Sequence, residues 1–288
     1  MNKLYILPGI VMFFSLSLVG QHKKITIQDI NTKQAIPYVS VIFKDTLTGM
    51  YANEKGEFSC SISKSVKLTC IGYKDTVINI SNNPSVVYMK PVIYVLDAIK
   101  IMPSNKEYTF GFFHLPARES VHFVGNAGCE YALYIPNTEN RNLVIKKIVI
   151  GAQEHKKLRV NDEDTYSVFR VNLYKVKPSH KIGELINTQQ LLYGSKILKE
   201  KTVLDISHLG LTLPPEGVFV SIEYLGKQIS HNNIAYEQTP LNYLLEPSLN
   251  VVKKTKELPY ILYTKHNLMG LDWKPFNEGL FCISIIAY

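Results

Sequence analysis

The chain has 288 residues, of which 46% are apolar and 19% charged, so it can bury a hydrophobic core and is neither intrinsically disordered nor collagen-like. Its formal net charge is +8, divided as +1 over residues 1–20, +4 over 21–101 and +3 over 102–288, and no run of Lys or Arg exceeds two residues. Because a phosphate-binding surface needs clustered cations, we expect no nucleic-acid partner.

The first 20 residues have the three parts of a secretory signal peptide. Lys3 gives a positive start, an uncharged stretch runs from Leu4 to Gly20, and the polar Gln21 follows. The sequence predicts cleavage between Gly20 and Gln21, and export to the periplasm, the outer membrane or the medium. An uncleaved anchor helix is the alternative, because 17 uncharged residues are close to the minimum for crossing a bilayer. No later stretch is apolar for long enough, so no integral membrane span is expected in the mature chain.

The chain has only four cysteines, at positions 60, 70, 129 and 282, too few for a disulfide-built scaffold. Cys60 and Cys70 each lie on the apolar side of an alternating run, which favours two small buried thiols. A disulfide between them across neighbouring strands is the alternative. No Cys-x-x-Cys pair occurs, so neither a redox motif nor a zinc knuckle is expected.

Residues 23–101 alternate between apolar and polar side chains in short runs, the pattern of antiparallel β-sheet. Turn residues separate these runs, and Gly49, Asn53 and Gly56 are expected to supply positive-φ turn positions. Six or seven short strands in about 80 residues predict a small β-sandwich. The runs cover 24–28, 37–44, 57–62, 65–71, 75–80 and 85–90.

Three motifs in this segment carry a resemblance to a known family: Ile27 to Val41, Asn53-Glu-Lys-Gly56-Glu-Phe58 and Cys70-Ile71-Gly72-Tyr73-Lys74. With them, residues 21–101 resemble the carboxypeptidase-regulatory-like domain, which is common in envelope proteins of Bacteroidetes bacteria. Members of that family usually have Gly where Ile25 and Lys33 stand here.

The resemblance implies a seven-stranded, transthyretin-like Greek-key sandwich without catalytic residues. The residues agree with structural roles. Pro37 suits the start of an edge strand because it has no N–H to donate. Phe58 is expected to begin an inward alternation, and Gly72 to allow a bend that lets Ile71 and Tyr73 pack in different directions.

Residues 92–110 follow Pro91 and contain Pro103-Ser104-Asn105-Lys106, a composition shift that predicts a linker. Beyond it the chain again has the pattern of β-strands, and Phe169, Val171 and Leu173 are expected to face a core. The polar stretch 226–257 is predicted to be a long loop. The expected strands cover 120–124, 129–135, 143–152, 165–176, 201–206, 217–225, 258–264 and 279–287.

Within residues 102–288, three segments resemble a jelly-roll-like sandwich of undefined function that often follows the regulatory-like domain: 169–174, 203–220 and 273–280. The predicted fold is therefore all-β, an N-terminal transthyretin-like Greek-key sandwich followed by a larger jelly-roll-like β-sandwich. A small outer-membrane barrel is the alternative, although the long polar stretch 226–257 does not fit its regular pattern of strands and turns.

The search for catalytic motifs finds none. The eight histidines, at 22, 114, 122, 155, 180, 208, 231 and 266, have no zinc-protease spacing, and neither a nucleophile elbow nor a phosphate-binding loop occurs. Asp162-Glu163-Asp164 lacks the ligand spacing of a calcium loop, so a solvated turn is favoured. No catalytic residue, metal ligand or cofactor is predicted.

Trp273 and Phe276 are the candidate ligand-binding residues, because exposed aromatic rings can stack on sugar rings. The alternative is that Trp273 holds the last loop against the sandwich. We therefore expect an exported, non-enzymatic envelope protein that acts as an interaction or binding module for a protein or cell-surface partner. The alternatives are a glycan-binding module and a hydrolase in the C-terminal domain, the latter with His114, His122 or His155 gathered near carboxylates.

Overall fold

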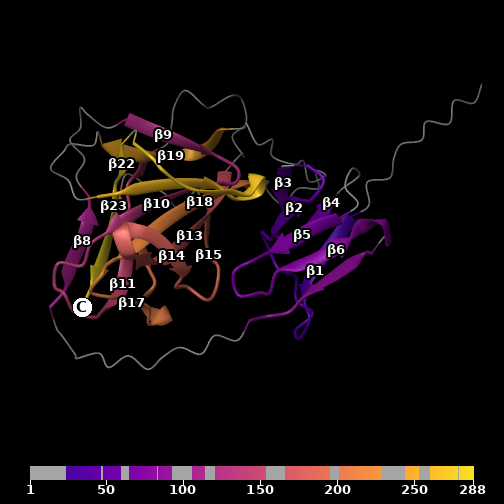
Figure 1. Ribbon diagram of the computed structural model, residues 1–288, viewed down its shortest axis with the longest axis horizontal. Helices are drawn as coiled ribbons and strands as arrows, with labels where there is room; N and C mark the ends of the chain where they lie inside the picture. Colours follow the sequence, from indigo (N-terminus) through magenta and orange to yellow (C-terminus); the bar gives the residue numbers. More distant parts are fainter. Residues whose placement is uncertain are drawn as a thin grey trace, which may run out of the picture.

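The structure is a computed structural model that describes residues 24–46, 48–59, 65–82, 84–92, 106–113, 121–153, 166–194, 201–228, 244–252, 260–277 and 279–288. Throughout these ranges the chain is all-β, as predicted, and its strands form two β-sandwiches that lie side by side (Figure 1). The helical elements of these ranges are short 3-10 turns: η1 (Ile80–Asn82), η2 (Pro178–His180), η4 (Ser207–Leu209) and η5 (Asn267–Met269).

The described strands of the N-terminal sandwich are β1 (Lys24–Asp29), β2 (Ser40–Phe43), β3 (Thr48–Tyr51), β4 (Glu57–Ser59), β5 (Ser65–Thr69), β6 (Thr76–Asn79) and β7 (Val86–Met89). They form one sheet in the order β4-β1-β7 and a second in the order β3-β2-β5-β6. All pairs are antiparallel except β1 with β7, which are parallel.

Alternation along these strands builds the N-terminal core. Ile25 and Ile27 of β1 and Val66 and Leu68 of β5 are fully buried between the sheets. Phe58 joins them with 1% of its surface exposed, so the predicted inward direction of this side chain is confirmed. The residues between the inward positions form the outer face of each sheet.

The predicted turn positions are only partly right. Gly56 has φ +69, as expected. Asn53 has no positive φ and instead supports the turn with its side chain, whose Oδ1 accepts the backbone N–H of Lys55 and of Glu57 at 2.9 Å each. Gly49 lies within β3, where a Cβ would be 2.7 Å from the carbonyl oxygen of Val41. Close approach of the backbone, rather than a turn, therefore explains this glycine.

Two further backbone positions have positive φ. Lys33 has φ +61, in the left-handed region that favours glycine. Gly72 has φ +85, and it separates Ile71, which lines the space between the sandwiches, from Tyr73, which packs against the N-terminal core. The bend predicted at Gly72 is therefore present.

The described strands of the C-terminal sandwich are β8 (Tyr108–Phe112), β9 (Val121–Asn126), β10 (Cys129–Ile135), β11 (Leu143–Ile150), β12 (Ala152–Gln153), β13 (Tyr166–Lys177), β14 (Lys181–Leu185), β15 (Leu191–Gly194), β16 (Thr202–Asp205), β17 (Thr212–Leu213), β18 (Val218–Gln228), β19 (Leu244–Val252), β20 (Leu262–His266), β21 (Leu271–Pro275), β22 (Leu280–Phe281) and β23 (Ile283–Ala287). The largest sheet has the order β14-β13-β18-β10-β20-β21, with β15 also paired to β13. Two further sheets have the orders β16-β11-β23-β8 and β12-β19-β22.

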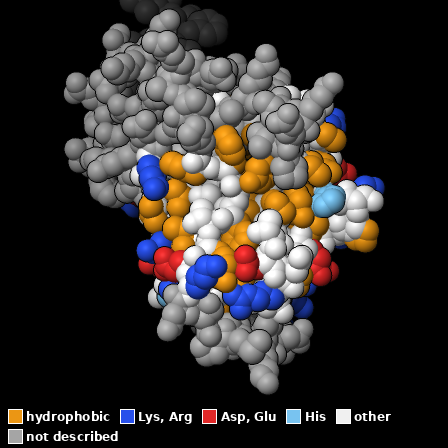
Figure 2. All heavy atoms as spheres, turned by 90° about the vertical axis from the view of Figure 1, so that its left-hand side faces the viewer, with side chains coloured by type: hydrophobic (Ala, Val, Ile, Leu, Met, Phe, Trp, Pro, Cys, Tyr) orange, Lys and Arg blue, Asp and Glu red, His pale blue; other side chains and the backbone are white. Residues whose placement is uncertain are grey.

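A second hydrophobic core fills this sandwich, separate from the N-terminal one. Phe169, Val171 and Leu173 of β13 are at most 1% exposed within it, which confirms the predicted inward face of that strand. On the side of the molecule away from the N-terminal sandwich, Figure 2 shows hydrophobic side chains gathered in the middle of the described face and charged ones along its margin.

Two sequence-based segment assignments are wrong. The predicted linker 92–110 contains the start of β8, which pairs with β23 and so belongs to the C-terminal sandwich. The predicted loop 226–257 contains β19, which pairs with β9. The length and polarity of the stretch were the basis for predicting a loop. Within β19, Pro247 lies where the register shifts between Leu245 and Leu249.

Candidate functional site

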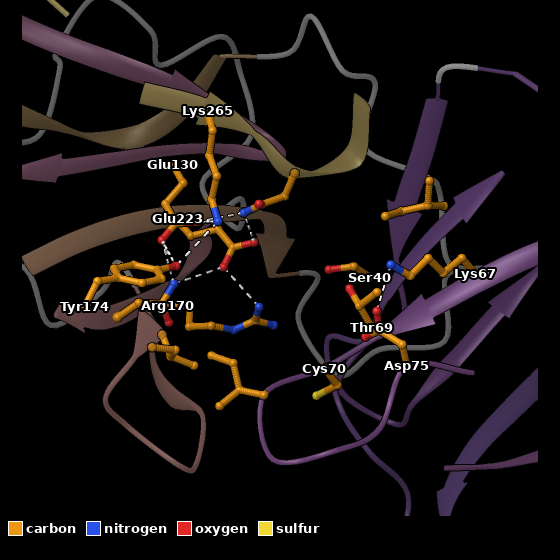
Figure 3. A pocket seen from close by; sticks show the side chains of 15 residues that line it. Ser40, Lys67, Thr69, Cys70, Asp75, Glu130, Arg170, Tyr174, Glu223 and Lys265 are labelled. Carbon is orange, nitrogen blue, oxygen red and sulfur yellow. Dashed lines mark hydrogen bonds and ion pairs between the residues drawn. The ribbon is translucent and has the colours of Figure 1, made fainter. Parts of the chain in front are cut away.

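An open cavity of about 390 Å³ lies between the two sandwiches. Its walls are the outer face of β2 and β5 on the N-terminal side and the outer face of the largest C-terminal sheet on the other, and the two sets of side chains face each other (Figure 3). Lining residues of the N-terminal sandwich are Ser40, Ile42, Lys67, Thr69, Cys70, Ile71 and Asp75; those of the C-terminal sandwich are Glu130, Arg170, Asn172, Tyr174, Leu185, Glu223, Lys265 and Asn267.

Strand register places four charged residues in one row across the C-terminal wall. Arg170 of β13 is the cross-strand neighbour of Glu223 of β18, Glu223 is the neighbour of Glu130 of β10, and Glu130 is the neighbour of Lys265 of β20. The order of charges is therefore plus, minus, minus, plus. Two like charges directly opposite each other destabilise a sheet, so the pair of glutamates needs compensation.

Glu130 is compensated by a full set of donors. Its Oε1 accepts hydrogen bonds from the Asn172 amide at 2.8 Å, the Tyr174 hydroxyl at 2.7 Å and the Ser221 hydroxyl at 2.5 Å. Its Oε2 accepts from the Asn267 amide at 2.9 Å and forms an ion pair with Lys265 Nζ, also at 2.9 Å. This carboxylate is fully buried and has no free lone pair to offer.

Glu223 is held in the same way. Its Oε2 forms an ion pair with Arg170 Nη1 at 3.0 Å, with both side chains less than 5% exposed. Its Oε1 accepts a hydrogen bond from Asn267 Nδ2 at 2.6 Å, so this amide bridges the two glutamates. Asn172 Nδ2 makes a second bridge, with 3.4 Å to Glu223 Oε2.

The N-terminal sandwich completes the network. The Tyr51 hydroxyl donates to Glu223 Oε1 at 2.6 Å, and Arg170 Nη2 donates to the backbone carbonyl of Tyr38 at 2.7 Å. Tyr38 has φ +53, which is an uncommon conformation for an aromatic residue. The carbonyl that this conformation presents to Arg170 is one of the polar contacts that join the sandwiches.

The pKa values show which charges the site stabilises. Burial alone would raise the pKa of Glu130, but Lys265 and the hydrogen-bond donors lower it to about 2. Burial would lower the pKa of Arg170, but the Glu223 carboxylate raises it. Burial and the neighbouring carboxylates raise the pKa of Tyr51 and Tyr174 well above the usual value, so both hydroxyls remain donors.

These features disfavour proton-transfer chemistry. A carboxyl group with a pKa of about 2 and no free lone pair is a poor general acid or base near neutral pH. Cys70 is a free thiol in the wall, and burial raises its pKa to about 11, so it is mainly the unreactive neutral form. The arrangement is suited to fixing geometry and to binding.

Two atoms of the C-terminal wall have no hydrogen-bond partner among the described residues: Arg170 Nε, a donor, and Asn172 Oδ1, an acceptor. Both residues are at most 3% exposed. The Asn172 amide cannot be turned round, because its Nδ2 must face the two carboxylates. Both atoms have less than 1 Å² of accessible surface. Leaving a buried polar atom unpaired costs about 1–3 kcal/mol, so these two atoms are a local energetic cost within the network.

Within the described ranges, no group of three or more His, Cys, Asp or Glu side chains is arranged to hold a metal ion. No histidine is among the residues found to line the cavity. Across the same part of the chain, no helix is long and apolar enough to span a bilayer.

The structure does not bring the two predicted ligand-binding residues together. Trp273 is half-buried on the outer face of the largest sheet, edge-on to Tyr174 with ring centroids 5.6 Å apart and with Lys265 Nζ 4.5 Å from its ring centre. Phe276 packs on the core side against Tyr131 and Phe281. Only Trp273 therefore adjoins the cavity, through Tyr174 and Lys265.

Other sequence candidates lie outside the described residues. They are the predicted cleavage site Gly20 and Gln21, the cysteine Cys60, the acidic turn 162–164 and the histidines His114 and His155. His122 belongs to β9, where only the backbone is described.

The row of charged residues across the C-terminal wall could not be recognised in the sequence. A single charged residue between apolar ones is also the pattern of a half-buried strand with one face in solvent. Glu223 stands in Phe219-Val-Ser-Ile-Glu-Tyr224, and Glu130 precedes Tyr131-Ala-Leu-Tyr-Ile135. The usable signal was the apolar residues on both faces of these strands, which indicates burial on both sides.

Comparison of the chain with family models, with curated proteins and with solved structures finds no match.

Proposed function

We propose that the chain is an exported, non-enzymatic binding or interaction protein of a bacterial cell envelope. In this proposal a carboxypeptidase-regulatory-like domain at residues 21–101 precedes a jelly-roll-like binding sandwich at 102–288. The signal-like first 20 residues, the motifs of the N-terminal segment and the all-β architecture support it.

The observation that carries the binding function is the buried polar network between the sandwiches. Hydrogen bonds from Tyr51 to Glu223 and from Arg170 to the Tyr38 carbonyl join the two units around a cavity. Both glutamates are held by several hydrogen-bond donors, and the pKa of Glu130 is lowered to about 2, which favours binding over acid–base catalysis.

Fractionation of the cells that produce the protein tests the export step. The protein is detected by antibody, and a cytoplasmic marker enzyme is followed beside it. The protein should appear in the periplasm, the outer membrane or the medium, and it should lack its first 20 residues. Recovery of the full-length chain with the cytoplasmic marker would overturn the proposal at that step.

A glycan-binding module is the second candidate, and one observation favours it: a cluster of aromatic side chains on the outer face of the C-terminal sheet. Tyr134, Tyr174 and Phe219 are buried there, with Tyr263 and Trp273 half-buried at its edge. A glycan array probed with the wild type and with Trp273→Ala tests this candidate. Binding that does not depend on Trp273 removes that residue from the site.

A further inference from the structure

We propose that the open edge of β7 binds an extended segment of another protein, which pairs with it as an additional strand and carries apolar side chains next to an acidic one. This inference rests on the proposed interaction function and gives it a surface and a kind of partner. The surface is separate from the cavity, which borders the outer face of β2 and β5 in the other N-terminal sheet.

Strand β7 is apolar on both of its faces. Val87 and Met89 point into the N-terminal core, where they are at most 7% exposed. Val86 and Tyr88 point outward and are 36% and 43% exposed. The other strands of this sheet have polar residues at their outward positions, as is usual for a sheet with one face in water: Lys24, Thr26, Gln28, Glu57 and Ser59. An apolar outward face on β7 alone indicates that a partner covers this strand.

The backbone of β7 is paired on one side, since β1 is its neighbour among the described strands. The carbonyl oxygens of Ser85 and Met89 each accept a hydrogen bond at 3.0 Å from the β1 side. Because successive residues of a strand direct their N–H and C=O groups to opposite sides, those of Val86 and Tyr88 point to the open edge. Only another polypeptide strand continues such a ladder, so the edge selects a protein segment over a sugar or a lipid.

Two lysines border the exposed apolar side chains. Lys33 Nζ lies 4.2 Å from the centre of the Tyr88 ring, and Lys90 is the next outward residue of β7. Among the described residues, neither lysine forms an ion pair with a carboxylate. Asp29, at the end of β1, is 7% exposed and accepts two backbone N–H groups of its own turn. An acidic residue in the bound segment would therefore be complementary to the two lysines.

The size of the surface suits a short segment better than a second folded copy. β7 is four residues long, and Ile30 adds one more exposed apolar side chain beside it, at 43%. A stable contact between folded proteins uses about 20–30 residues on each side. An extended segment rises about 3.3 Å per residue, so about four of its residues match the length of β7.

Three variants of the full chain test the contact. Proline is tolerated on an edge strand where its missing N–H would face solvent, so Val86→Pro removes an edge donor and leaves the bonds to β1 in place. Tyr88→Ser removes the exposed ring, and Lys33→Glu reverses a bordering charge. Val77→Thr is the matched control, because Val77 is 53% exposed but belongs to β6 in the other sheet.

The probe is a phage-displayed library of random octapeptides, selected on the immobilised wild type. We expect the selected peptides to have apolar residues at alternate positions next to an acidic residue. Titration of the synthetic peptides, followed by fluorescence anisotropy, should show affinity lower by about tenfold or more in the three variants and unchanged in Val77→Thr, because each variant removes a contact of the peptide.

Methylation of the peptide nitrogens gives a second readout that needs no variant. Two versions of one peptide are methylated, each at one of its two alternating sets of backbone nitrogens. The set that faces β7 should lose binding to the wild type, and the other should keep it, because only the first set donates to the edge.

Four results would each overturn the inference: no peptide selected by the wild type, equal binding of the two methylated peptides, full affinity in a folded Val86→Pro protein, or preference for basic over acidic flanks. A wild-type dimer that Val86→Pro dissociates would also overturn it, because the occupant would then be a second copy. None of these results bears on export, and retention of the protein in the cytoplasm would refute export without touching the peptide contact.

Discussion

At the scale of single residues, Arg170 has a central place in the polar contact between the two sandwiches. It compensates Glu223 on the C-terminal side and donates to the Tyr38 carbonyl on the N-terminal side. Arg170→Met should lower the free energy of unfolding by about 3–5 kcal/mol, because it leaves a buried carboxylate without its cation. Urea denaturation measures this loss.

The matched control is Lys175→Met on the same strand. Lys175 pairs with Glu184 at 3.3 Å, but both side chains are more than 60% exposed. Its loss should change stability by less than about 1 kcal/mol. Equal effects of the two substitutions would contradict the structural role given to Arg170.

Glu130 makes stability depend on pH in a defined direction. Its pKa is about 2 in the folded chain, against an ordinary value of 4.5, so its contribution is fully present above about pH 4.5 and is lost as the pH falls towards 2. The difference corresponds to stabilisation on the order of 3 kcal/mol. Glu130→Gln should lower stability at pH 7 and flatten the curve of unfolding free energy against pH between 5 and 2. Parallel curves for the two proteins would rule out this role.

At the scale of elements, the turn after β5 contacts the C-terminal sandwich through Gly72. A Cβ there would be 2.9 Å from the carbonyl oxygen of Thr188, and the residue has φ +85. Gly210 is the control, because it has φ +59 but a Cβ at that position would have no atom of the described residues within 4 Å. Gly210→Ala should cost about 1–2 kcal/mol for the left-handed backbone alone.

Gly72→Ala should cost more than Gly210→Ala, because the backbone of Thr188 must also move. Thermal unfolding of both variants, followed by the fluorescence of Trp273, measures the difference. If the two losses are equal, Gly72 has no part in the contact between the sandwiches.

The elements that could be predicted from the sequence are those with regular alternation. The inward faces of β1, β4, β5 and β13 follow from period-2 patterns, and Phe58, Phe169 and Leu173 are buried accordingly. Strands with irregular patterns could not be predicted. β19 contains Pro247 at an irregular point of its pairing. β8 begins inside the predicted linker 92–110.

The site could not be predicted for a related reason. Its polar row depends on the register of four strands that are far apart in the sequence, which places Arg170 next to Glu223 and Glu130 next to Lys265. Register is set by tertiary packing, so no motif records it. The sequence did identify Gly72 and Trp273, which lie next to the cavity walls, although for other reasons.

At the scale of the whole molecule, two sandwiches with separate cores are joined by the buried network, so we expect them to unfold as one cooperative unit. A ligand in the cavity between them would stabilise both units together, because it binds only when they are in contact. The two cores are therefore expected to unfold together.

Differential scanning calorimetry of the full chain measures whether the two cores unfold together. We expect one unfolding transition for the wild type, with equal calorimetric and van't Hoff enthalpies, and its separation into two transitions in Arg170→Met. Two independent transitions in the wild type, unchanged by loss of Arg170, would contradict it.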